Sequence, residues 1–426
     1  MKKRYMMKVV GIVSLALSIA TLSFSCADKE TGMLIGTDFE KPDYDPDENT
    51  NQEIIKETVR VFEEAKEGYH SYRIPSLTVA PNGDLIAMAE GRKLTSLDYG
   101  DIDIVAKVSS DRGKTWSALK VVVSEGEGTW GNPTVVTDYI NNRIWLFMSW
   151  NSDSHSQNGG SFNGKNYPAV TEWGQRRVFT IYSDDNGQTW SSPHDRTEQL
   201  LPLDFIWDAV GPGSGIQVQN GPNKGRLIIP AGERNIYSDD FGETWKFQRI
   251  PKNTFEGSIV ELSSGLLLRN DRAVAGTWNR GKYRYISKGS IEGGFSAFSA
   301  DPNLIDPRCQ ASILRMSFTP NIIAFVNPAR NDGDTMPYRC NMTIRLSADD
   351  GQSWFASREL TYPGIPQQDL CVSGYGGYTS MAKINDKEIA LLVEHVGDPT
   401  AGAAINRKHS IDFHRFNLNW VIEDVD

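Results

Sequence analysis

The chain has 426 residues, with 44 lysines and arginines against 54 aspartates and glutamates, giving a net charge of −10. Nucleic-acid binding draws its affinity from clustered cations, so this acidic chain, which has no stretch rich in lysine or arginine, is not expected to bind DNA or RNA. Net charge does not exclude a small cationic pocket for an anionic ligand. With 39% hydrophobic residues, 10% aromatic residues and 38 glycines, the composition excludes a disordered or fibrous protein.

The N-terminus has the pattern of a secretory signal peptide over residues 1–25. A basic start is followed by an apolar run to Phe24 that is too short for a typical membrane span, and then by a small residue before Cys26. We therefore expect an exported protein. Cys26 is a candidate lipid anchor, although the serines before it also suit ordinary signal cleavage. Residues 26–51 are acidic and polar, which predicts a flexible tether.

The sequence from residue 52 to residue 426 is typical of one all-β domain. Short runs with alternating apolar residues are separated by clusters of Gly, Asn and Asp, and such runs predict strands. The runs cover residues 59–62, 102–108, 144–150, 178–182, 227–230, 322–326, 342–346 and 389–393.

A motif of the form S-x-D-x-G-x-[ST]-W occurs four times, beginning at Ser109, Ser183, Ser238 and Ser347. The interval between the third and fourth copies is close to twice the interval between the second and third, so a further repeat is expected between Ser238 and Ser347. A decayed copy at residues 290–296 lies where this repeat is expected. The Asp and Gly of each copy suit a hairpin turn. Repeats of this length indicate a β-propeller, for which we expect six blades of four antiparallel strands. The strand near Val59 should pair with residues 411–416 and close the ring.

This repeat resembles the Asp box of the sialidase (neuraminidase) superfamily. Such boxes also form peripheral turns in non-enzymatic propellers, so we expect their aspartates to be structural.

A more specific resemblance is Tyr72-Arg73-Ile74-Pro75, which matches the [F/Y]-R-I-P motif that opens bacterial sialidase domains. The arginine of this motif binds a carboxylate in that family, and the resemblance implies the same role for Arg73.

Residues 90–105 are similar to the sialidase segment that carries the catalytic acid. Asp98 aligns with this acid, in a loop that could close over a substrate. Arg92 resembles a further arginine near the family's pocket, where it would bind substrate. Asp101 and Asp103 are competitors for the acid, although Asp103 falls in an alternating strand, where a structural role is expected.

A second cluster of family positions follows the third box. In sialidases, a Glu at the start of a strand and an Arg in an N-x-R at the end of its hairpin partner face the same cavity. These positions map onto Glu256 and Arg272. Arg269 is the rival for Arg272, and Glu261 is expected to be solvated in a turn.

The remaining family positions lie near the last box. An Asn-Pro pair, a loop and an arginine some eight residues before the box serine point to Arg339 as a further substrate ligand. Tyr378 begins a variant of the family's Tyr-Ser-x-Leu and is the candidate nucleophile, and Glu394 would orient Arg73. The match departs from the family where Thr replaces Ser and Met replaces Leu. Tyr375 therefore stays an alternative nucleophile.

The resemblance covers nearly all of residues 59–426 and implies an exo-α-sialidase that hydrolyses terminal sialic acid from glycans, glycoproteins or glycolipids. The resemblance also implies a retaining mechanism, in which Tyr378 attacks with help from Glu256 and Asp98 serves as acid and then base. No metal or organic cofactor is required, and we expect a monomer. The alternatives are a non-catalytic sialoglycan-binding propeller and a trans-sialidase, including an intramolecular one.

Three cysteines follow Cys26, namely Cys309, Cys340 and Cys371. Their odd number leaves at least one free thiol unless two chains are joined, and we favour buried structural cysteines with one disulfide at most. The chain has no C-x-x-C or H-E-x-x-H pattern, so no metal site is expected. The signal peptide, taken with the resemblance to bacterial enzymes, predicts the periplasm, outer membrane or cell surface of a Gram-negative bacterium.

Overall fold

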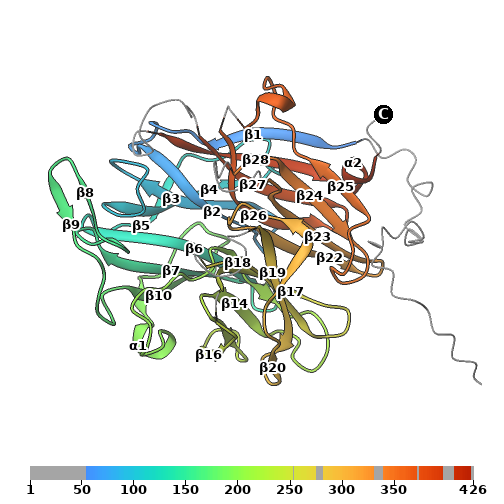
Figure 1. Ribbon diagram of the computed structural model, residues 1–426, viewed down its shortest axis with the longest axis horizontal. Coiled ribbons are helices and arrows are strands. Elements are labelled where there is room, and N and C mark those ends of the chain that lie inside the picture. The colour runs from blue at the N-terminus through green and yellow to red at the C-terminus, as the bar shows by residue number, and fades with distance from the viewer. Residues whose placement is uncertain are drawn as a thin grey trace, which may run out of the picture. The chain divides into compact units, whose positions relative to one another are not determined.

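The computed structural model describes residues 54–252, 254–274, 282–330, 339–371, 374–396 and 407–423. The predicted signal peptide and the predicted tether lie outside these ranges. Antiparallel β-sheets dominate the described residues (Figure 1). The helices are short, at Thr197–Leu200 (α1) and Leu418–Ile422 (α2), with a 3₁₀ turn at Gln367–Asp369. Within the described ranges, no helix has the length and apolar character needed to cross a membrane.

The first and last strands share a sheet. Its order is β1 (Lys56–Phe62), β28 (His409–Asn417), β27 (Glu388–Val396) and β26 (Tyr375–Asn385). Strand β1 runs antiparallel to β28, with Val59 opposite Phe413. The predicted pairing of the strand near Val59 with residues 411–416 is thus confirmed.

The largest sheet has nine strands and contains two antiparallel groups. The first group is β2 (Ser71–Val79), β3 (Leu85–Arg92), β4 (Ile102–Ser109) and β5 (Lys120–Val123). The second is β6 (Gly128–Asp138), β7 (Arg143–Ser152), β10 (Arg177–Ser183) and β11 (His194–Asp195). The groups meet through a parallel pairing of Ile102 with Thr129. Strand β12 (Gly213–Ser214) adds to β6 in parallel.

The other sheets are smaller. One contains β13 (Ile216–Gln217), β14 (Leu227–Ala231), β15 (Arg234–Ser238) and β16 (Lys246–Arg249). The next contains β17 (Thr254–Glu261), β18 (Leu267–Ala273), β19 (Tyr283–Ser290), β20 (Gly294–Phe295) and β21 (Ser299–Ile305). Another contains β22 (Ser312–Phe318), β23 (Asn321–Pro328), β24 (Met342–Ser347) and β25 (Ala356–Glu359). A separate hairpin is formed by β8 (Gly160–Phe162) and β9 (Lys165–Tyr167).

The sheets pack in a propeller-like arrangement. Strand β2 contacts β6 and β26, β14 contacts β6 and β17, and β22 contacts β17 and β26. Apolar side chains from neighbouring sheets fill the space between them, as where Leu77 and Ala87 pack with Leu392 and Phe413. Burial of each leucine or phenylalanine side chain among them stabilises the packed sheets by about 1.5–3 kcal/mol. The predicted all-β class is confirmed.

The four Asp boxes are turns held by the same hydrogen bonds. In the first copy, Asp111 accepts bonds from the Ser109 hydroxyl at 2.8 Å and the Thr115 backbone N–H at 2.9 Å. Side-chain and backbone hydrogen bonds from Thr115 lower the pKa of Asp111 to about 2. Gly113 has a φ of 87°, and a Cβ there would overlap the Phe413 ring. In the decayed copy, the Gly293 N–H still donates to the Ser290 hydroxyl at 2.8 Å. These aspartates therefore serve the turns.

Candidate active site

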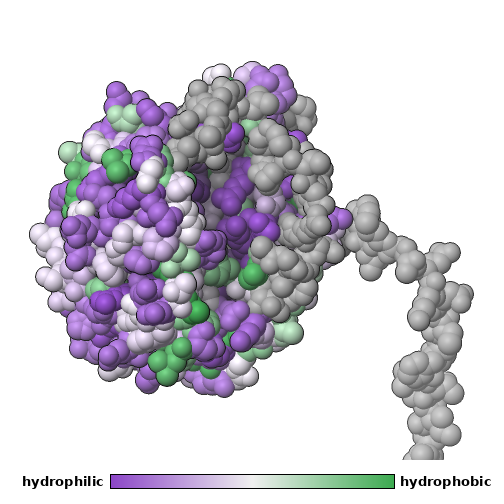
Figure 2. Space-filling model, turned by 60° about the vertical axis from the view of Figure 1, so that its left-hand side comes forward, coloured by the Kyte–Doolittle hydropathy of each residue, from purple (hydrophilic) through white to green (hydrophobic). Residues whose placement is uncertain are grey.

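Side chains from several strands converge on one cavity of about 520 Å³. The space-filling view shows a hollow with hydrophilic residues on its walls (Figure 2). The cavity lining includes seven of the eight residues that the sequence predicts for the site, namely Arg73, Arg92, Asp98, Glu256, Arg272, Arg339 and Tyr378. The eighth, Glu394, pairs with Arg73 at the side of this cavity.

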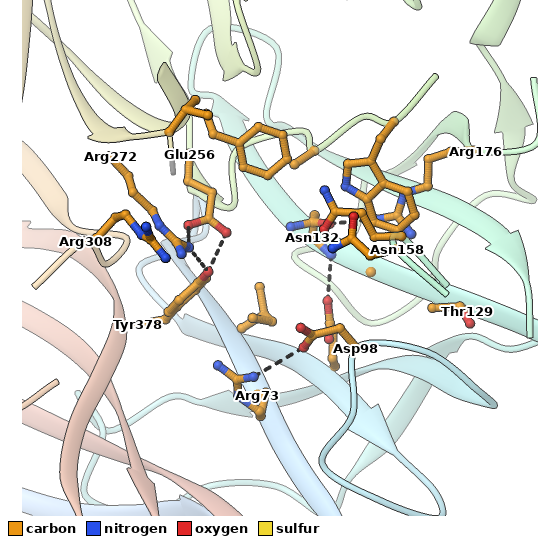
Figure 3. A pocket seen from close by; sticks show the side chains of 18 of the residues that line it. Arg73, Asp98, Thr129, Asn132, Asn158, Arg176, Glu256, Arg272, Arg308 and Tyr378 are labelled. Carbon is orange, nitrogen blue, oxygen red and sulfur yellow. Dashed lines mark hydrogen bonds and ion pairs between the residues drawn. The ribbon is translucent and has the colours of Figure 1, made fainter. Parts of the chain in front are cut away.

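Tyr378 and Glu256 meet within this cavity, although they are 122 residues apart in the chain (Figure 3). The Tyr378 hydroxyl donates a short hydrogen bond to Glu256 Oε1. Arg272 Nη1 donates to Glu256 Oε2 at 2.5 Å and to the Tyr378 hydroxyl at 2.8 Å. The phenol oxygen thus has a carboxylate that can accept its proton and a guanidinium that can stabilise a developing negative charge.

The ring of Tyr378 is buried among cations. The guanidinium carbons of Arg73 and Arg339 lie 5.6 Å and 5.2 Å from its centroid. Burial raises the pKa of Tyr378 well above its usual range, and the nearby Glu256 carboxylate adds to this, so the hydroxyl is protonated at neutral pH. The free thiol of Cys309 packs against the same ring, and burial raises the pKa of Cys309 to about 12.

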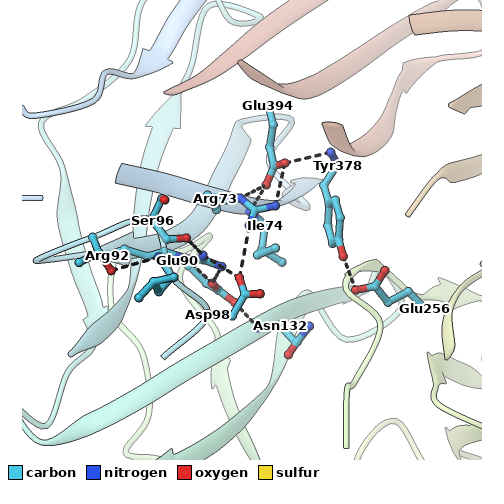
Figure 4. Close-up of polar contacts among 12 residues, drawn as sticks. Arg73, Ile74, Glu90, Arg92, Ser96, Asp98, Asn132, Glu256, Tyr378 and Glu394 are labelled. Atoms are coloured by element: carbon cyan, nitrogen blue, oxygen red, sulfur yellow. Dashed lines mark hydrogen bonds and ion pairs between the residues drawn. The ribbon is translucent and has the colours of Figure 1, made fainter. Parts of the chain in front are cut away.

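Arg73 is held by Glu394 and by an unusual backbone at Ile74 (Figure 4). Arg73 Nε and Nη2 each donate to Glu394 at 3.2 Å. Ile74 has a φ of 56°, which is rare for a β-branched residue, and its N–H donates to Glu394 Oε1 at 2.9 Å. The register of β2 shifts between Arg73 and Ser76. This bulge and the Glu394 carboxylate together fix where the guanidinium points.

Two glycines let the neighbouring elements approach Tyr378 closely. A Cβ at Gly376 would overlap the carbonyl oxygen of Arg339, and a Cβ at Gly377 would lie 2.5 Å from Glu394 Oε2. The Tyr378 N–H donates to the same Glu394 carboxylate at 3.1 Å. The Gly-Gly pair is therefore needed for Arg339, Glu394 and Tyr378 to pack together.

A disulfide reinforces the same region of the site. Cys340 and Cys371 are bonded, and Cys309 is a buried free thiol. Cys340 directly follows Arg339, and Cys371 lies shortly before the strand that carries Tyr378. The disulfide therefore ties the backbone of a cavity arginine to the chain leading into the tyrosine strand.

Asp98 lies between two arginines at the edge of the cavity. Its carboxylate is 2.7 Å from Arg92 Nη1 and 3.3 Å from Arg73 Nη1, and its side chain is 77% exposed. The guanidiniums of Arg92 and Arg73 favour the ionised carboxylate and hold the pKa of Asp98 well below its usual range. Arg92 also binds Glu90 at 2.6 Å and the carbonyl of Ser96. Its donors are thus directed to protein groups, including Asp98.

The rival residues do not line this cavity. Tyr375 is buried elsewhere, and its hydroxyl bonds to His414 Nε2 at 2.6 Å. Arg269 pairs with Asp271 at 2.9 Å, and both side chains are fully buried. Asp103 accepts a bond from the Tyr69 hydroxyl at 2.7 Å.

Asp101 and Glu261 also lie outside the lining of this cavity. Asp101 pairs with Lys93 at 3.0 Å rather than lining the cavity. Glu261, expected to be solvated, is instead 3% exposed, and its carboxylate accepts hydrogen bonds from the backbone N–H groups of Gln219 and Asn220.

Sequence reasoning missed several polar residues of the cavity. Arg176, Asn132 and Asn158 lie across the pocket from Tyr378, and Arg308 lies beside Arg272 (Figure 3). Arg176 donates to Asn132 Oδ1 at 2.7 Å and stacks 4.3 Å from the Trp207 ring centroid. Burial lowers the pKa of Arg176 to about 10. No motif surrounds these residues, so only their placement in the fold identifies them.

Among the described residues, no group of three or more His, Cys, Asp or Glu side chains is arranged to hold a metal ion. The cavity is instead rich in guanidiniums, which suits an anion that they can bind through charge-assisted hydrogen bonds. A tyrosine paired with a carboxylate stands beside them. This combination can bind a carboxylated ligand and attack it with a neutral nucleophile.

Known proteins that are similar in sequence to this chain include sialidases. A model of the BNR repeat-like domain matches residues 83–368. The exo-α-sialidase of Aspergillus fumigatus is 39% identical over 377 residues, covering 83% of this chain and 86% of that protein. The sialidase of Micromonospora viridifaciens is 32% identical and covers 84% of this chain, which spans 53% of that longer protein.

Solved structures share the fold. A Hadza microbial sialidase has a TM-score of 0.67 at 24% identity, covering 86% of this chain and 69% of its own. The intramolecular trans-sialidase of Ruminococcus gnavus also has a TM-score of 0.67, at 18% identity, covering 86% of this chain and 99% of its own. At this identity the likeness concerns the fold alone.

The BNR repeats, the propeller-like fold and the curated relatives place the chain among the glycoside hydrolases. Within that class it belongs to the exo-α-sialidase family, as its identity to the Aspergillus fumigatus enzyme over most of both chains shows. The relatives are fungal as well as bacterial. Membership therefore concerns the whole family rather than its bacterial branch.

Proposed function

We propose that this protein is an exo-α-sialidase that removes terminal sialic acid from glycoconjugates by a retaining mechanism with Tyr378 as the nucleophile. The observation that carries the proposal is the hydrogen bond from the Tyr378 hydroxyl to Glu256, made inside a cavity lined by Arg73, Arg272 and Arg339. Sialidases are the glycosidases known to use a tyrosine in this role.

Substrate binding rests on the three arginines. Sialic acid carries a carboxylate on its anomeric carbon, and Arg73, Arg272 and Arg339 would hold this group by charge-assisted hydrogen bonds. Glu394 positions Arg73 for that contact. A carboxylate nucleophile would be repelled by the substrate's own charge, whereas a neutral phenol is not.

In the first step, the Tyr378 oxygen forms a bond to the anomeric carbon while the glycosidic bond breaks. Glu256 takes the phenol proton, and Asp98 gives a proton to the leaving oxygen. In the second step, the Asp98 carboxylate takes a proton from water, whose oxygen attacks the anomeric carbon. The bond to Tyr378 breaks, and Glu256 returns its proton to the phenolate.

Asp98 must be protonated to act as the acid, yet Arg92 and Arg73 favour its ionised form. A substrate carboxylate bound to Arg73 would compete for that guanidinium and place a second negative charge near Asp98. Both effects raise the pKa of Asp98. Substrate binding would thus supply the proton-donating form where it is needed.

The test is hydrolysis of a fluorogenic aryl sialoside by the purified protein with a chelator present. Tyr378→Phe should lower kcat by roughly 100-fold or more, because the phenol oxygen that forms the intermediate is gone. Tyr375→Phe is the matched control and should stay within about tenfold of wild type, since only its bond to His414 is lost. Undiminished hydrolysis by Tyr378→Phe, or an inactive wild type, would refute the proposal.

We further propose that the domain of residues 52–426 is a propeller of six four-stranded blades. The nine-stranded sheet divides into two four-stranded groups joined by one parallel pairing, and the contacts among β2, β6, β14, β17, β22 and β26 close a ring. We also propose export directed by residues 1–25, with a tether over residues 26–51 and a lipid anchor at Cys26. Limited proteolysis and mass spectrometry of the exported protein test these boundaries.

A further inference from the structure

The side chain of Gln310 binds both backbone polar groups of Thr379, the residue that follows Tyr378. Gln310 lies between β21 and β22 and is 2% exposed. Its Oε1 accepts the Thr379 N–H at 2.8 Å. Its Nε2 donates to the Thr379 carbonyl at 2.9 Å and to the Pro212 carbonyl at 3.3 Å. The Gln310 amide therefore holds the chain directly after the tyrosine.

Strand β26 lacks regular strand pairing at this point. It is the edge strand of its sheet, in the order β1-β28-β27-β26, and its register with β27 shifts between Tyr375 and Thr379. Tyr378 therefore lies where the regular ladder of hydrogen bonds is interrupted. Paired residues of an antiparallel sheet exchange two N–H···O bonds. A carboxamide has the same donor and acceptor as a peptide group, so Gln310 makes this pair of bonds to Thr379 in place of a strand.

Gln310 is in turn anchored to the strand that carries Arg272. The carbonyl of Cys309, the residue before Gln310, accepts a hydrogen bond from Arg284 Nη1. Arg284 also donates from Nε to Asn270 Oδ1 at 2.7 Å and from Nη2 to the Asn270 carbonyl at 3.0 Å. Both side chains are buried, and Asn270 precedes Arg272 by two residues in β18. A buried polar network thus joins the backbone at Gln310 to the Arg272 strand.

The position of the Tyr378 hydroxyl follows from these anchors. A tyrosine side chain sits in a few staggered rotamers, so the peptide groups on either side of it largely decide where its hydroxyl lies. Glu394 accepts the Tyr378 N–H at 3.1 Å, and Gln310 accepts the next N–H along the chain. On this backbone, the hydroxyl bonds to Glu256 and lies 2.8 Å from Arg272 Nη1.

Removal of the Gln310 amide would release one side of this backbone. The Thr379 carbonyl also accepts a hydrogen bond from the Ser312 hydroxyl at 2.9 Å, but the buried Thr379 N–H would lose its acceptor. An unpaired buried donor is costly, so the strand would shift to regain a partner, and the Tyr378 ring would move with it. A misplacement of about 1 Å lowers the rate of a reaction step by roughly 100-fold.

We propose that Gln310 is a positioning residue for the nucleophile: its amide, bonded to both backbone groups of Thr379, holds the Tyr378 oxygen where it can reach the anomeric carbon. This inference rests on the proposed function, because it concerns the bond that this oxygen forms in the first step. Gln310 does not line the active-site cavity, so it acts through Tyr378 and touches no substrate. Its loss slows the attack and leaves the binding of sialic acid by the arginines unchanged.

The experiment measures covalent labelling of the full-length protein by 2,3-difluorosialic acid, followed by intact mass spectrometry. The anomeric fluoride of this probe leaves as the Tyr378 oxygen bonds to the carbon, so labelling reports on the nucleophile. Gln310→Met keeps the length of the side chain and removes both hydrogen bonds. It should lower the labelling rate constant at saturating probe about 10- to 100-fold. The final labelled fraction should match wild type, and the inhibition constant of free sialic acid should stay within about twofold.

A second variant and a control accompany this measurement. Gln310→Asn keeps the amide but is one methylene shorter, so it cannot make both bonds to Thr379 and should slow labelling about three- to tenfold. Gln248→Met is the matched control, because the Gln248 amide also donates to two backbone carbonyls, those of Ser290 and Ile291. None of these three residues lines the active-site cavity, so Gln248→Met should be labelled at the wild-type rate.

The outcomes separate the two proposals. A wild type that is neither labelled nor able to hydrolyse an aryl sialoside would overturn the proposed function. With an active wild type, labelling of either Gln310 variant at the wild-type rate would overturn the positioning role alone. The same holds if Gln310→Met lowers only the labelled fraction, if it weakens sialic acid binding as much as it slows labelling, or if Gln248→Met slows labelling equally. Should Gln310→Met fail to fold, the rate constant of Gln310→Asn decides.

Discussion

Replacing Glu394 by glutamine tests how the site holds Arg73 and Tyr378. The Glu394 carboxylate is 2% exposed and accepts hydrogen bonds from the backbone N–H groups of Ile74 and Tyr378 and from Arg73 Nε and Nη2. Glutamine keeps the shape but loses the charge, and its NH₂ group would face donors. The substitution therefore weakens contacts to both the carboxylate-binding arginine and the nucleophile strand.

The expected loss follows from the pKa of Glu394. Burial raises this pKa, but the charge of Arg73 outweighs burial, and the pKa is lowered from 4.5 to about 2. Such a difference favours folding by about 3 kcal/mol at pH 7. Because the folded-state pKa is depressed, this stability is present above the unfolded value of 4.5 and is lost as the pH falls toward 2. About half of it should remain at pH 3.

The assay is chemical denaturation of wild type and Glu394→Gln at pH 7 and pH 3, with KM for an aryl sialoside measured at neutral pH. We expect the variant to lose about 3 kcal/mol at pH 7 and about half of that at pH 3, with KM raised roughly tenfold through Arg73. Glu261→Gln is the control: burial raises the pKa of Glu261, so its deficit should not shrink on acidification. A Glu394→Gln deficit equal at both pH values would refute the reasoning.

Three further predictions concern the same site. Gly376→Ala should raise KM for a sialoside roughly tenfold or more, because its Cβ would displace the Arg339 carbonyl; an unchanged KM would contradict this packing. Reduction of the Cys340–Cys371 disulfide should raise KM several-fold and reoxidation should restore it, whereas the Cys340→Ser/Cys371→Ser variant should not respond to reductant. Asp98→Asn should lower kcat/KM roughly 100- to 10,000-fold for sialyllactose but much less for an aryl sialoside, whose leaving group needs little protonation; equal losses would exclude Asp98 as the acid.

Local chemistry made much of the fold predictable. The alternating apolar runs became strands such as β4, β7, β10 and β24, because the period of the side chains decides which face of a sheet is buried. The Asp boxes became turns, because their hydrogen bonds join residues within four positions of each other, as between Asp111 and Thr115. Arg73 and the family positions after it could be named from motifs alone.

The sequence by itself determined the β class, the repeat and a short list of candidate residues with rivals. Only the tertiary structure decided that Tyr378 rather than Tyr375 bonds to Glu256, and that Arg272 rather than Arg269 lines the cavity. Arg176 had no sequence signal at all. The physical reason is that these contacts join distant strands, and bulges and sheet packing set the direction of each side chain.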